Sequence, residues 1–383
     1  MRIGLNATCF NERPSGARQR FAGIYGALIR RSPEIEFVIY EPRDCPVGSW
    51  FAGAPNAKVV ATPLPSSGRV RRAAIGMGYW QAALAGERLD LFETFNLPLV
   101  RAPDCPTILT VHDARPVLRE VPLLKRLLYG TVIRSALRRA DHVITVSETM
   151  RGEIRAIEPA ASVTTIYNGI DPVPFDRVDP ADTAAVRERL ALPDSFLLAV
   201  GHLEQRKNYV RLVEALWRLR DGGPPQSLVI VGNDGGNGAA IRSAVERYRL
   251  GDHVRILSGV SDRELAALYA LSRLVVFPSY YEGFGIPVLE AMAAHRPLAV
   301  SDIPVFRELT EGEGARFPPH DAPAMAAILA DVLGDEARQR ALVAYGDRRV
   351  HDFAFERLAE QVARVHRTVL GGSCEVEPEA AAA

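Results

Sequence analysis

Two periodicities of apolar residues divide this chain into predicted strands and helices. Short runs rich in β-branched residues are typical of buried parallel strands, and apolar residues three or four positions apart are typical of helices. In the first half, strands are predicted at residues 2–6, 36–40, 58–62, 89–93, 107–111, 142–146 and 163–167. Helices are predicted there at residues 17–31, 70–85, 123–140 and 148–157. Such alternation favours an α/β fold with a doubly wound parallel sheet.

The second half repeats the pattern. Its predicted strands are residues 196–200, 227–231, 254–257, 274–277 and 298–300, and its predicted helices are residues 208–220, 239–249, 262–271, 288–294 and 322–333. Segment 171–182, rich in proline and aspartate, is predicted to be an interdomain connection. The sequence thus predicts two Rossmann-like domains, residues 1–172 and 183–350, facing a central cleft at the carboxyl ends of their strands.

The C-terminal region is predicted to contain one long helix within residues 351–371, followed by a disordered tail at residues 372–383. The chain has 383 residues, which is enough for two or three domains with large cores. Lys plus Arg and Asp plus Glu both number 46, so the net charge gives no reason to expect a nucleic-acid partner.

The four cysteines form no C-x-x-C pair, which is typical of free thiols in a reducing compartment. The N-terminus starts directly with a predicted strand, and no apolar run reaches the length of a membrane span. We therefore expect a cytoplasmic protein, attached at most to the inner face of the plasma membrane.

The most informative stretch is SYYEGFGIPVLEAMAA, residues 279–294, directly after a predicted strand. Gly283 and Gly285 permit a tight loop that a ligand can approach closely, and Pro287 suits the first position of a helix. A helix N-terminus behind a glycine loop favours a phosphate. Because Glu282 and Glu290 flank this point, a ligand that combines phosphate with hydroxyls, such as a nucleotide sugar, fits better than a simple anion.

The string E-G-F-G-x-P-x-x-E-A-M-A resembles the signature of the retaining glycosyltransferases of family 4, which have the GT-B fold. The resemblance implies that Glu290 holds the ribose hydroxyls of the donor and that Glu282 lies at its sugar and diphosphate. It also implies donor contacts from the loop residues Gly283, Phe284 and Gly285. In addition, it implies that the C-terminal helix within residues 351–371 crosses back onto the N-terminal domain.

A basic pair opens the predicted helix after strand 196–200, in the segment G-H-L-E-Q-R-K-N. Arg206 and Lys207 could neutralise a diphosphate and the charge that develops on a leaving group. The segment, which begins at Gly201, resembles the phosphate-binding segment of the same family. The family's nucleobase loop corresponds to the segment around Val260, and which base it binds stays open between guanine and uracil. The glycine-rich turn 232–238 lacks the lysine and hydroxyl of a P-loop and is predicted to be a flexible loop.

Two first-half positions complete the predicted site. The family has V-H-D where this chain has Val111-His112-Asp113, which implies that His112 lies near the transferred sugar in an orienting role. Gly16 corresponds to the family's N-terminal glycine loop and is expected at the donor diphosphate. That loop departs from the commoner G-x-G-R-Y pattern, so Arg18 or Arg20 could instead meet the acceptor.

The resemblance implies a retaining enzyme in which the departing phosphate accepts the acceptor's proton. No Asp-x-Asp pair is present, so we expect neither a metal nor another cofactor. The expected reaction moves a hexose of the mannose or glucose type from a GDP- or UDP-linked donor to a glycan or polyprenyl-linked saccharide. Bacterial surface polysaccharide and lipopolysaccharide biosynthesis is the expected setting, by analogy with the family.

Two alternatives share this architecture. A sugar-nucleotide 2-epimerase would release free product without an acceptor, and a non-catalytic nucleotide-sugar-binding protein would bind donor without turnover. Separately, helix 123–140 mixes leucines with arginines. This pattern fits a surface helix packed on the core, or a face that contacts anionic lipid.

Overall fold

The computed structural model describes residues 1–12, 15–95, 97, 99–102, 104–114, 123–220 and 226–371, with the side chains of residues 69 and 123–126 left aside. The chain divides into two compact units, one formed by residues 1–169 with the segment from Phe355 onward and the other by residues 170–354. The predicted disordered tail, residues 372–383, lies outside the described residues.

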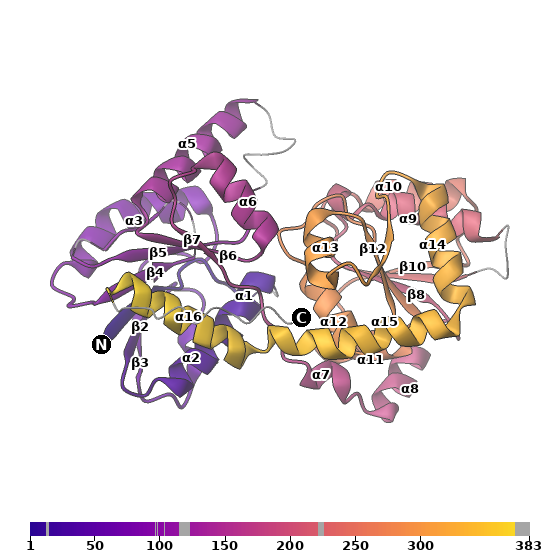
Figure 1. The fold of residues 1–383 in the computed structure, drawn as a ribbon, viewed down its shortest axis with the longest axis horizontal. Coiled ribbons are helices and arrows are strands. Elements are labelled where there is room, and N and C mark those ends of the chain that lie inside the picture. Colours follow the sequence, from indigo (N-terminus) through magenta and orange to yellow (C-terminus); the bar gives the residue numbers. More distant parts are fainter. Residues whose placement is uncertain are drawn as a thin grey trace, which may run out of the picture. The chain divides into compact units, whose positions relative to one another are not determined.

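The first unit contains a seven-stranded sheet in the order β3-β2-β1-β4-β5-β6-β7, all parallel (Figure 1). Its strands are β1 (Arg2–Asn6), β2 (Glu36–Glu41), β3 (Ala57–Ala61), β4 (Leu91–Thr94), β5 (Thr107–Val111), β6 (His142–Thr145) and β7 (Val163–Thr165). Its helices include α1 (Gly16–Arg20), α2 (Gly26–Arg31), α3 (Arg69–Leu84), α5 (Leu123–Arg139), α6 (Glu148–Ile157) and α16 (Phe355–Val369). The doubly wound parallel sheet predicted for this half is therefore present.

The second unit contains a six-stranded parallel sheet in the order β10-β9-β8-β11-β12-β13. Its strands are β8 (Leu197–Val200), β9 (Leu228–Val231), β10 (Val254–Leu257), β11 (Leu274–Phe277), β12 (Leu298–Ser301) and β13 (Ala315–Phe317). Its helices include α7 (Val173–Asp176), α8 (Pro180–Arg189), α9 (Tyr209–Leu219), α10 (Gly238–Arg247), α11 (Asp262–Leu271), α12 (Ile286–Ala293), α13 (Pro304–Thr310), α14 (Ala322–Gly334) and α15 (Glu336–Arg349). Strands β8, β9, β11 and β12 are buried throughout, as expected for central parallel strands.

The sequence pattern missed strand β13, helices α13 and α15, and an interruption of the first helix. Strand β13 has only three residues and Arg316 at its centre, and α15 carries many charges, so neither shows a clear apolar period. The single helix predicted at residues 17–31 is interrupted by a π-helical turn, Phe21–Tyr25. Gly23 lies in this turn, where a Cβ atom would come within 2.3 Å of the Phe355 ring. The glycine thus lets the start of α16 pack closely against this helix.

The segment expected to be an irregular connection instead contains α7 and the start of α8 and belongs to the second unit. Phe175 of α7 packs its ring edge-on against Tyr269 of α11, with ring centroids 5.6 Å apart. His295, after α12, joins the same segment to α15. Its Nε2 lies 2.8 Å from Asp176 Oδ1 and its Nδ1 lies 2.7 Å from Asp347 Oδ1.

The His295 contacts predict a pH-dependent contribution to stability. Hydrogen bonds to Asp176 and Asp347 raise the pKa of His295 above its ordinary value. A histidine whose folded-state pKa is raised stabilises the fold fully below its unfolded-state pKa, and the effect is lost as pH rises through the folded-state pKa. We expect His295→Asn to lower the thermal midpoint by about 2 °C at about pH 5.5 and by less at about pH 9. Asparagine is the matched replacement because it tolerates the φ of +55° at this position. If thermal unfolding showed the same drop in midpoint at both pH values, protonated His295 would not be the stabilising form.

Candidate functional site

The loop after β8 folds back on itself and presents the predicted basic pair. Gly201 has a φ of +142°, and a Cβ atom there would come within 2.8 Å of Lys207 Cε, so glycine allows the lysine to lie across the loop. Asn208 has a left-handed φ of +59°. Its Nδ2 donates to the carbonyl oxygens of Pro278, at 2.9 Å, and Pro319, at 2.8 Å. These two bonds hold the start of α9 beside the loop that follows β11.

The two cations meet Glu282 in what we call the cation–glutamate cluster, formed by Glu204, Arg206, Lys207 and Glu282. Lys207 Nζ lies 2.8 Å from Glu282 Oε1, and Arg206 Nη1 pairs with Glu282 Oε2. Arg206 Nε also lies 2.5 Å from Glu204 Oε2. Ser279 Oγ donates to Glu282 Oε1 at 2.8 Å, which fixes the carboxylate from the side of β11. The structure therefore brings together Arg206, Lys207 and Glu282, as expected from the sequence.

The cluster keeps Glu282 ionised although its side chain is buried. Burial alone would raise its pKa, but the charges of Lys207 and Arg206 outweigh burial and hold the pKa of Glu282 below its ordinary value. Burial would likewise lower the pKa of Arg206, and Glu282 and Glu204 reverse that effect. The charges of the two cations and the two carboxylates therefore cancel. A bound diphosphate would share the cations with these carboxylates.

Glu290 lies in α12 and has a different environment. Tyr269 Oη donates to Glu290 Oε2 at 2.8 Å, and within the described part of the chain no other side chain bonds to this carboxyl group. Burial raises the pKa of Glu290 to about 7. A buried carboxyl group with one protein donor retains acceptor capacity, which suits a ligand with neighbouring hydroxyls.

After Glu282, residues 283–285 of the loop before α12 offer backbone rather than polar side chains. Phe284 is buried with its ring 6.0 Å from that of Phe353, so only its backbone can face a ligand. Gly285 has a φ of +128° and a Cβ atom there would meet Phe306 Cε1 at 2.9 Å. Val260 is half-buried in the loop between β10 and α11, next to Ser261, which caps α11 in a capping box with Glu264.

The glycine-rich turn 232–238 packs against the loop that carries the cluster, and its flexibility stays a prediction. A Cβ atom at Gly232 would lie 2.0 Å from the Gly201 carbonyl oxygen, and one at Gly235 would lie 2.7 Å from Glu204 Cγ. Leu203 N donates to Asn233 O at 2.9 Å, and Asp234 Oδ1 accepts from the backbone nitrogens of Gly236 and Gly238. These glycines permit close backbone packing against Gly201–Glu204.

Gly232→Ala is therefore expected to displace the backbone at Gly201, and with it the loop that carries the cation–glutamate cluster. The clash involves a backbone atom, which cannot rotate away, so we expect a loss of unfolding free energy of about 1–3 kcal/mol. Gly251→Ala is the matched control, because a Cβ atom there meets nothing within 4 Å. Urea unfolding of both variants checks the expectation, and equal stability of the two variants would contradict it.

In the first unit, His112 follows β5 and is half-buried. Its Nε2 atom is buried and has no hydrogen-bond partner in the described part of the chain. Burial, followed by the charge of Arg20, lowers the pKa of His112 to about 3, so the imidazole is neutral at physiological pH. Gly16 begins α1 after Ser15, whose side chain caps the helix.

The two arginines near Gly16 differ in exposure. Arg20 is buried and its Nη1 donates to the carbonyl oxygens of Ile166, at 2.8 Å, and Tyr167. It therefore serves the interior of the first unit, and the expectation that it meets an acceptor is wrong. Arg18 is half-buried, bonds to Glu12 O and lies over the Trp50 ring at 4.8 Å.

Sequence reasoning missed a buried carboxylate that contacts β5, the strand that His112 follows. Glu93 of β4 is fully buried and its Oε1 accepts hydrogen bonds from Tyr25 and, at 3.0 Å, from Thr110 of β5. Its Oε2 lies 2.9 Å from His366 Nε2 on α16. The only signal was an acidic residue within an apolar strand. No group of three or more His, Cys, Asp or Glu residues that could hold a metal is present among the described residues.

Comparisons with known proteins match both units. A model described as "Glycosyl transferases group 1" matches residues 182–349, and one described as "Glycosyltransferase Family 4" matches residues 15–173. The chain is 31% identical over 242 residues to the O-antigen chain mannosyltransferase RfbU of Salmonella typhimurium, covering 61% of this chain and 63% of the relative. The chain thus spans less than two thirds of the length of that relative.

Two solved structures share the fold. Sucrose-phosphate synthase from Thermosynechococcus elongatus is similar with a TM-score of 0.76 at 22% identity, covering 97% of this chain and 100% of that one. Anabaena HepE in complex with UDP-glucose is similar with a TM-score of 0.75 at 19% identity, covering 96% of this chain and 100% of that one. At such identities the likeness concerns the fold, which is GT-B, as predicted. None of the described helices has the length and apolar character needed to span a membrane.

Proposed function

Because the chain belongs to the group 1 and family 4 glycosyltransferases, we propose that it transfers a hexosyl unit from a nucleotide-diphosphate sugar to a saccharide acceptor. The observation that carries the proposal is the cation–glutamate cluster beside Glu290. Arg206 and Lys207 supply positive charge for the diphosphate, and Glu290 supplies an acceptor for ribose hydroxyls. Phosphate and hydroxyl recognition together describe a nucleotide sugar.

The cations also suit the chemistry of the step. The bond that breaks joins the sugar's anomeric carbon to the diphosphate, so negative charge develops on the departing phosphate oxygen. Fixed cations at that position stabilise the transition state. We propose that these side chains act without a divalent metal and that the reaction retains the anomeric configuration, with the departing phosphate taking the acceptor's proton. His112, with a neutral ring and an unpartnered Nε2 among the described residues, is assigned to orienting a sugar hydroxyl.

The sugar, base and acceptor are proposed from the relatives. O-antigen chain mannosyltransferases are among them, which favours mannose and a GDP-linked donor, with a lipid-linked saccharide of bacterial surface polysaccharide as acceptor. HepE binds UDP-glucose, so glucose from a UDP-linked donor is the second candidate.

The test incubates the purified protein with radiolabelled GDP-mannose or UDP-glucose in EDTA, with and without a polyprenyl-linked saccharide. Label in the lipid fraction that depends on acceptor supports the proposal, and NMR of the product identifies the anomer. Free altered sugar without acceptor would indicate a 2-epimerase instead. Donor binding without any turnover across a panel of acceptors would indicate a binding protein.

We also propose that α5 contacts an anionic membrane. Leu127 and Leu128 are 59% and 60% exposed, and Arg139 lies on the same helix. Arg138 lies there too, with its Nε 2.6 Å from Glu158 Oε2. Exposed leucines and cations on one helix are typical of a membrane-surface contact, in which each cation contributes about 1 kcal/mol.

Leu127→Ser with Leu128→Ser should weaken sedimentation with anionic vesicles roughly tenfold, because two exposed apolar side chains no longer enter the interface. Val173→Ser, at an exposed position of α7, is the matched control. Undiminished sedimentation of the double variant, or equal binding to zwitterionic vesicles, would contradict this contact.

A further inference from the structure

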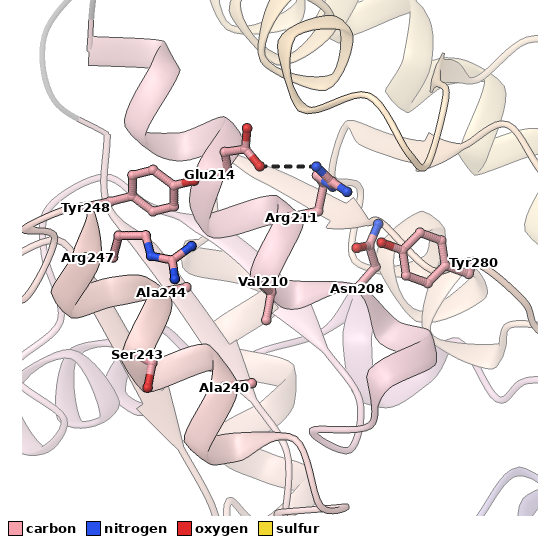
Figure 2. A pocket seen from close by; sticks show the side chains of 10 residues that line it. All are labelled: Asn208, Val210, Arg211, Glu214, Ala240, Ser243, Ala244, Arg247, Tyr248 and Tyr280. Atoms are coloured by element: carbon pink, nitrogen blue, oxygen red, sulfur yellow. Dashed lines mark hydrogen bonds and ion pairs between the residues drawn. The ribbon is translucent and has the colours of Figure 1, made fainter.

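A pocket of about 440 Å³ lies between α9 and α10 of the second unit, apart from the cation–glutamate cluster (Figure 2). Three of its lining residues are small or apolar, Val210, Ala240 and Ala244. Its other lining residues are polar or charged, and we call them the rim whatever their depth: Asn208, Arg211, Glu214, Ser243, Arg247, Tyr248 and Tyr280. A volume in this range accommodates a small molecule of one or two sugar rings.

The rim carries an excess of positive charge. Arg211 Nη1 is 3.3 Å from Glu214 Oε2, and Glu214 also pairs with Arg218 at 3.1 Å. Figure 2 shows the Arg247 side chain extending from α10 toward α9, and this arginine is exposed. Among the described residues, Arg247 has no ion-pair or hydrogen-bond partner. An anionic substituent on a ligand would supply that missing partner.

Two tyrosine rings are held in place beside these arginines. Tyr248 stacks on Trp217 with ring centroids 5.2 Å apart and an interplanar angle of 28°. Tyr280 stacks on His320 at 4.6 Å and 17°. Fixed aromatic rings next to hydroxyl and guanidinium groups suit the mixed apolar and polar faces of a sugar ring.

We propose that this pocket is a second binding site, for a sugar carrying an anionic substituent. Arg247 binds the anion, and the tyrosines and Ser243 contact the sugar ring. Free phosphorylated monosaccharides and acidic residues of a glycan share this chemistry. The site does not depend on the proposed transferase activity, because none of its rim residues belongs to the cluster. It adjoins the cluster through the backbone, since Tyr280 N donates to Arg206 O at 2.8 Å.

Calorimetric titration of the full chain tests the site with four probes: glucose 6-phosphate, trigalacturonate, glucose and inorganic phosphate. We expect saturable binding of one or both anionic sugars, and clearly weaker binding of glucose and of phosphate. Binding of glucose 6-phosphate alone identifies a free phosphorylated sugar as the class of ligand, and binding of trigalacturonate alone identifies acidic glycan residues.

The variants separate this site from the donor site. Arg247→Ala should weaken binding of the anionic sugar roughly 10- to 100-fold, since one charge-assisted hydrogen-bonding group is lost. Arg348→Ala, at an exposed position of α15 outside the pocket, should leave it unchanged. The cluster variant that combines Arg206→Ala, Lys207→Ala and Glu282→Gln, in which no unpaired Glu282 charge is left buried, should also leave it unchanged in samples that circular dichroism shows to be folded. The proposal is overturned if neither anionic sugar binds, if phosphate binds as tightly as they do, if Arg247→Ala has no effect, or if the cluster variant abolishes binding.

Discussion

Replacing both Arg206 and Lys207 with alanine should weaken the binding of nucleoside diphosphates by a factor of roughly 10²–10⁴ in EDTA. Each side chain offers a charge-assisted hydrogen bond to a phosphate, and both already point at one position, the carboxylate of Glu282. Calorimetric titration with GDP and UDP measures the loss and identifies the preferred base. Wild-type affinity in the double variant would place the diphosphate elsewhere.

The same substitutions remove the charges that keep Glu282 ionised, so lost binding must be separated from lost folding. With both cations gone, Glu282 is buried and keeps the hydrogen bond from Ser279, which does not neutralise its charge, so we expect the fold to be less stable. Adding Glu282→Gln to the double variant removes the buried charge and should restore part of the stability. Nucleotide binding should stay absent in this triple variant, which distinguishes a missing ligand contact from an unfolded protein.

Much of the second unit could be predicted because its signals are local. Glu282, the glycine loop and Glu290 lie within one short stretch, and the basic pair directly follows a strand, so sequence order places each at a strand end. Their meeting required only the parallel pairing of β8 with β11, which a doubly wound sheet implies. The contribution of Glu204 was not foreseen, because a carboxylate beside a basic pair has no distinctive spacing.

The supporting contacts could not be predicted because they join residues far apart in the chain. Tyr269, the donor to Glu290, belongs to an apolar helical pattern and gives no sign of its hydrogen bond. Phe175, which packs on Tyr269, lies in a segment whose prolines favoured a connection over a helix. Glu93 and His366 meet because α16 packs in the first unit, as the family resemblance implied, but no local pattern predicts the contact between these two side chains.

The second large effect concerns Glu290, for which stability and ligand binding should respond in opposite directions. Its pKa is raised to about 7 by burial, whereas an unfolded glutamate has a pKa of about 4.3. The carboxyl group therefore favours the folded state less and less as pH rises from about 4.3 through about 7, and the penalty above that range is on the order of 3 kcal/mol. Glu290→Gln keeps the shape and an acceptor for Tyr269 but cannot ionise.

We therefore expect Glu290→Gln to unfold at higher urea concentration than the wild type at about pH 8, and at nearly the same concentration at about pH 5. Nucleoside diphosphate affinity should fall roughly 10- to 100-fold, because a charged acceptor for the ribose hydroxyls is lost.

Glu282→Gln is the matched comparison, and its expected change in stability is in the opposite direction. Lys207 and Arg206 stabilise the Glu282 carboxylate, so its neutral replacement should lower stability at about pH 8. If Glu290→Gln were instead less stable than the wild type at about pH 8, the ionised Glu290 side chain would stabilise the unliganded fold, and the expectation would be wrong. A gain in stability together with a loss of nucleotide affinity would show that this residue is retained for its ligand at the expense of the unliganded fold.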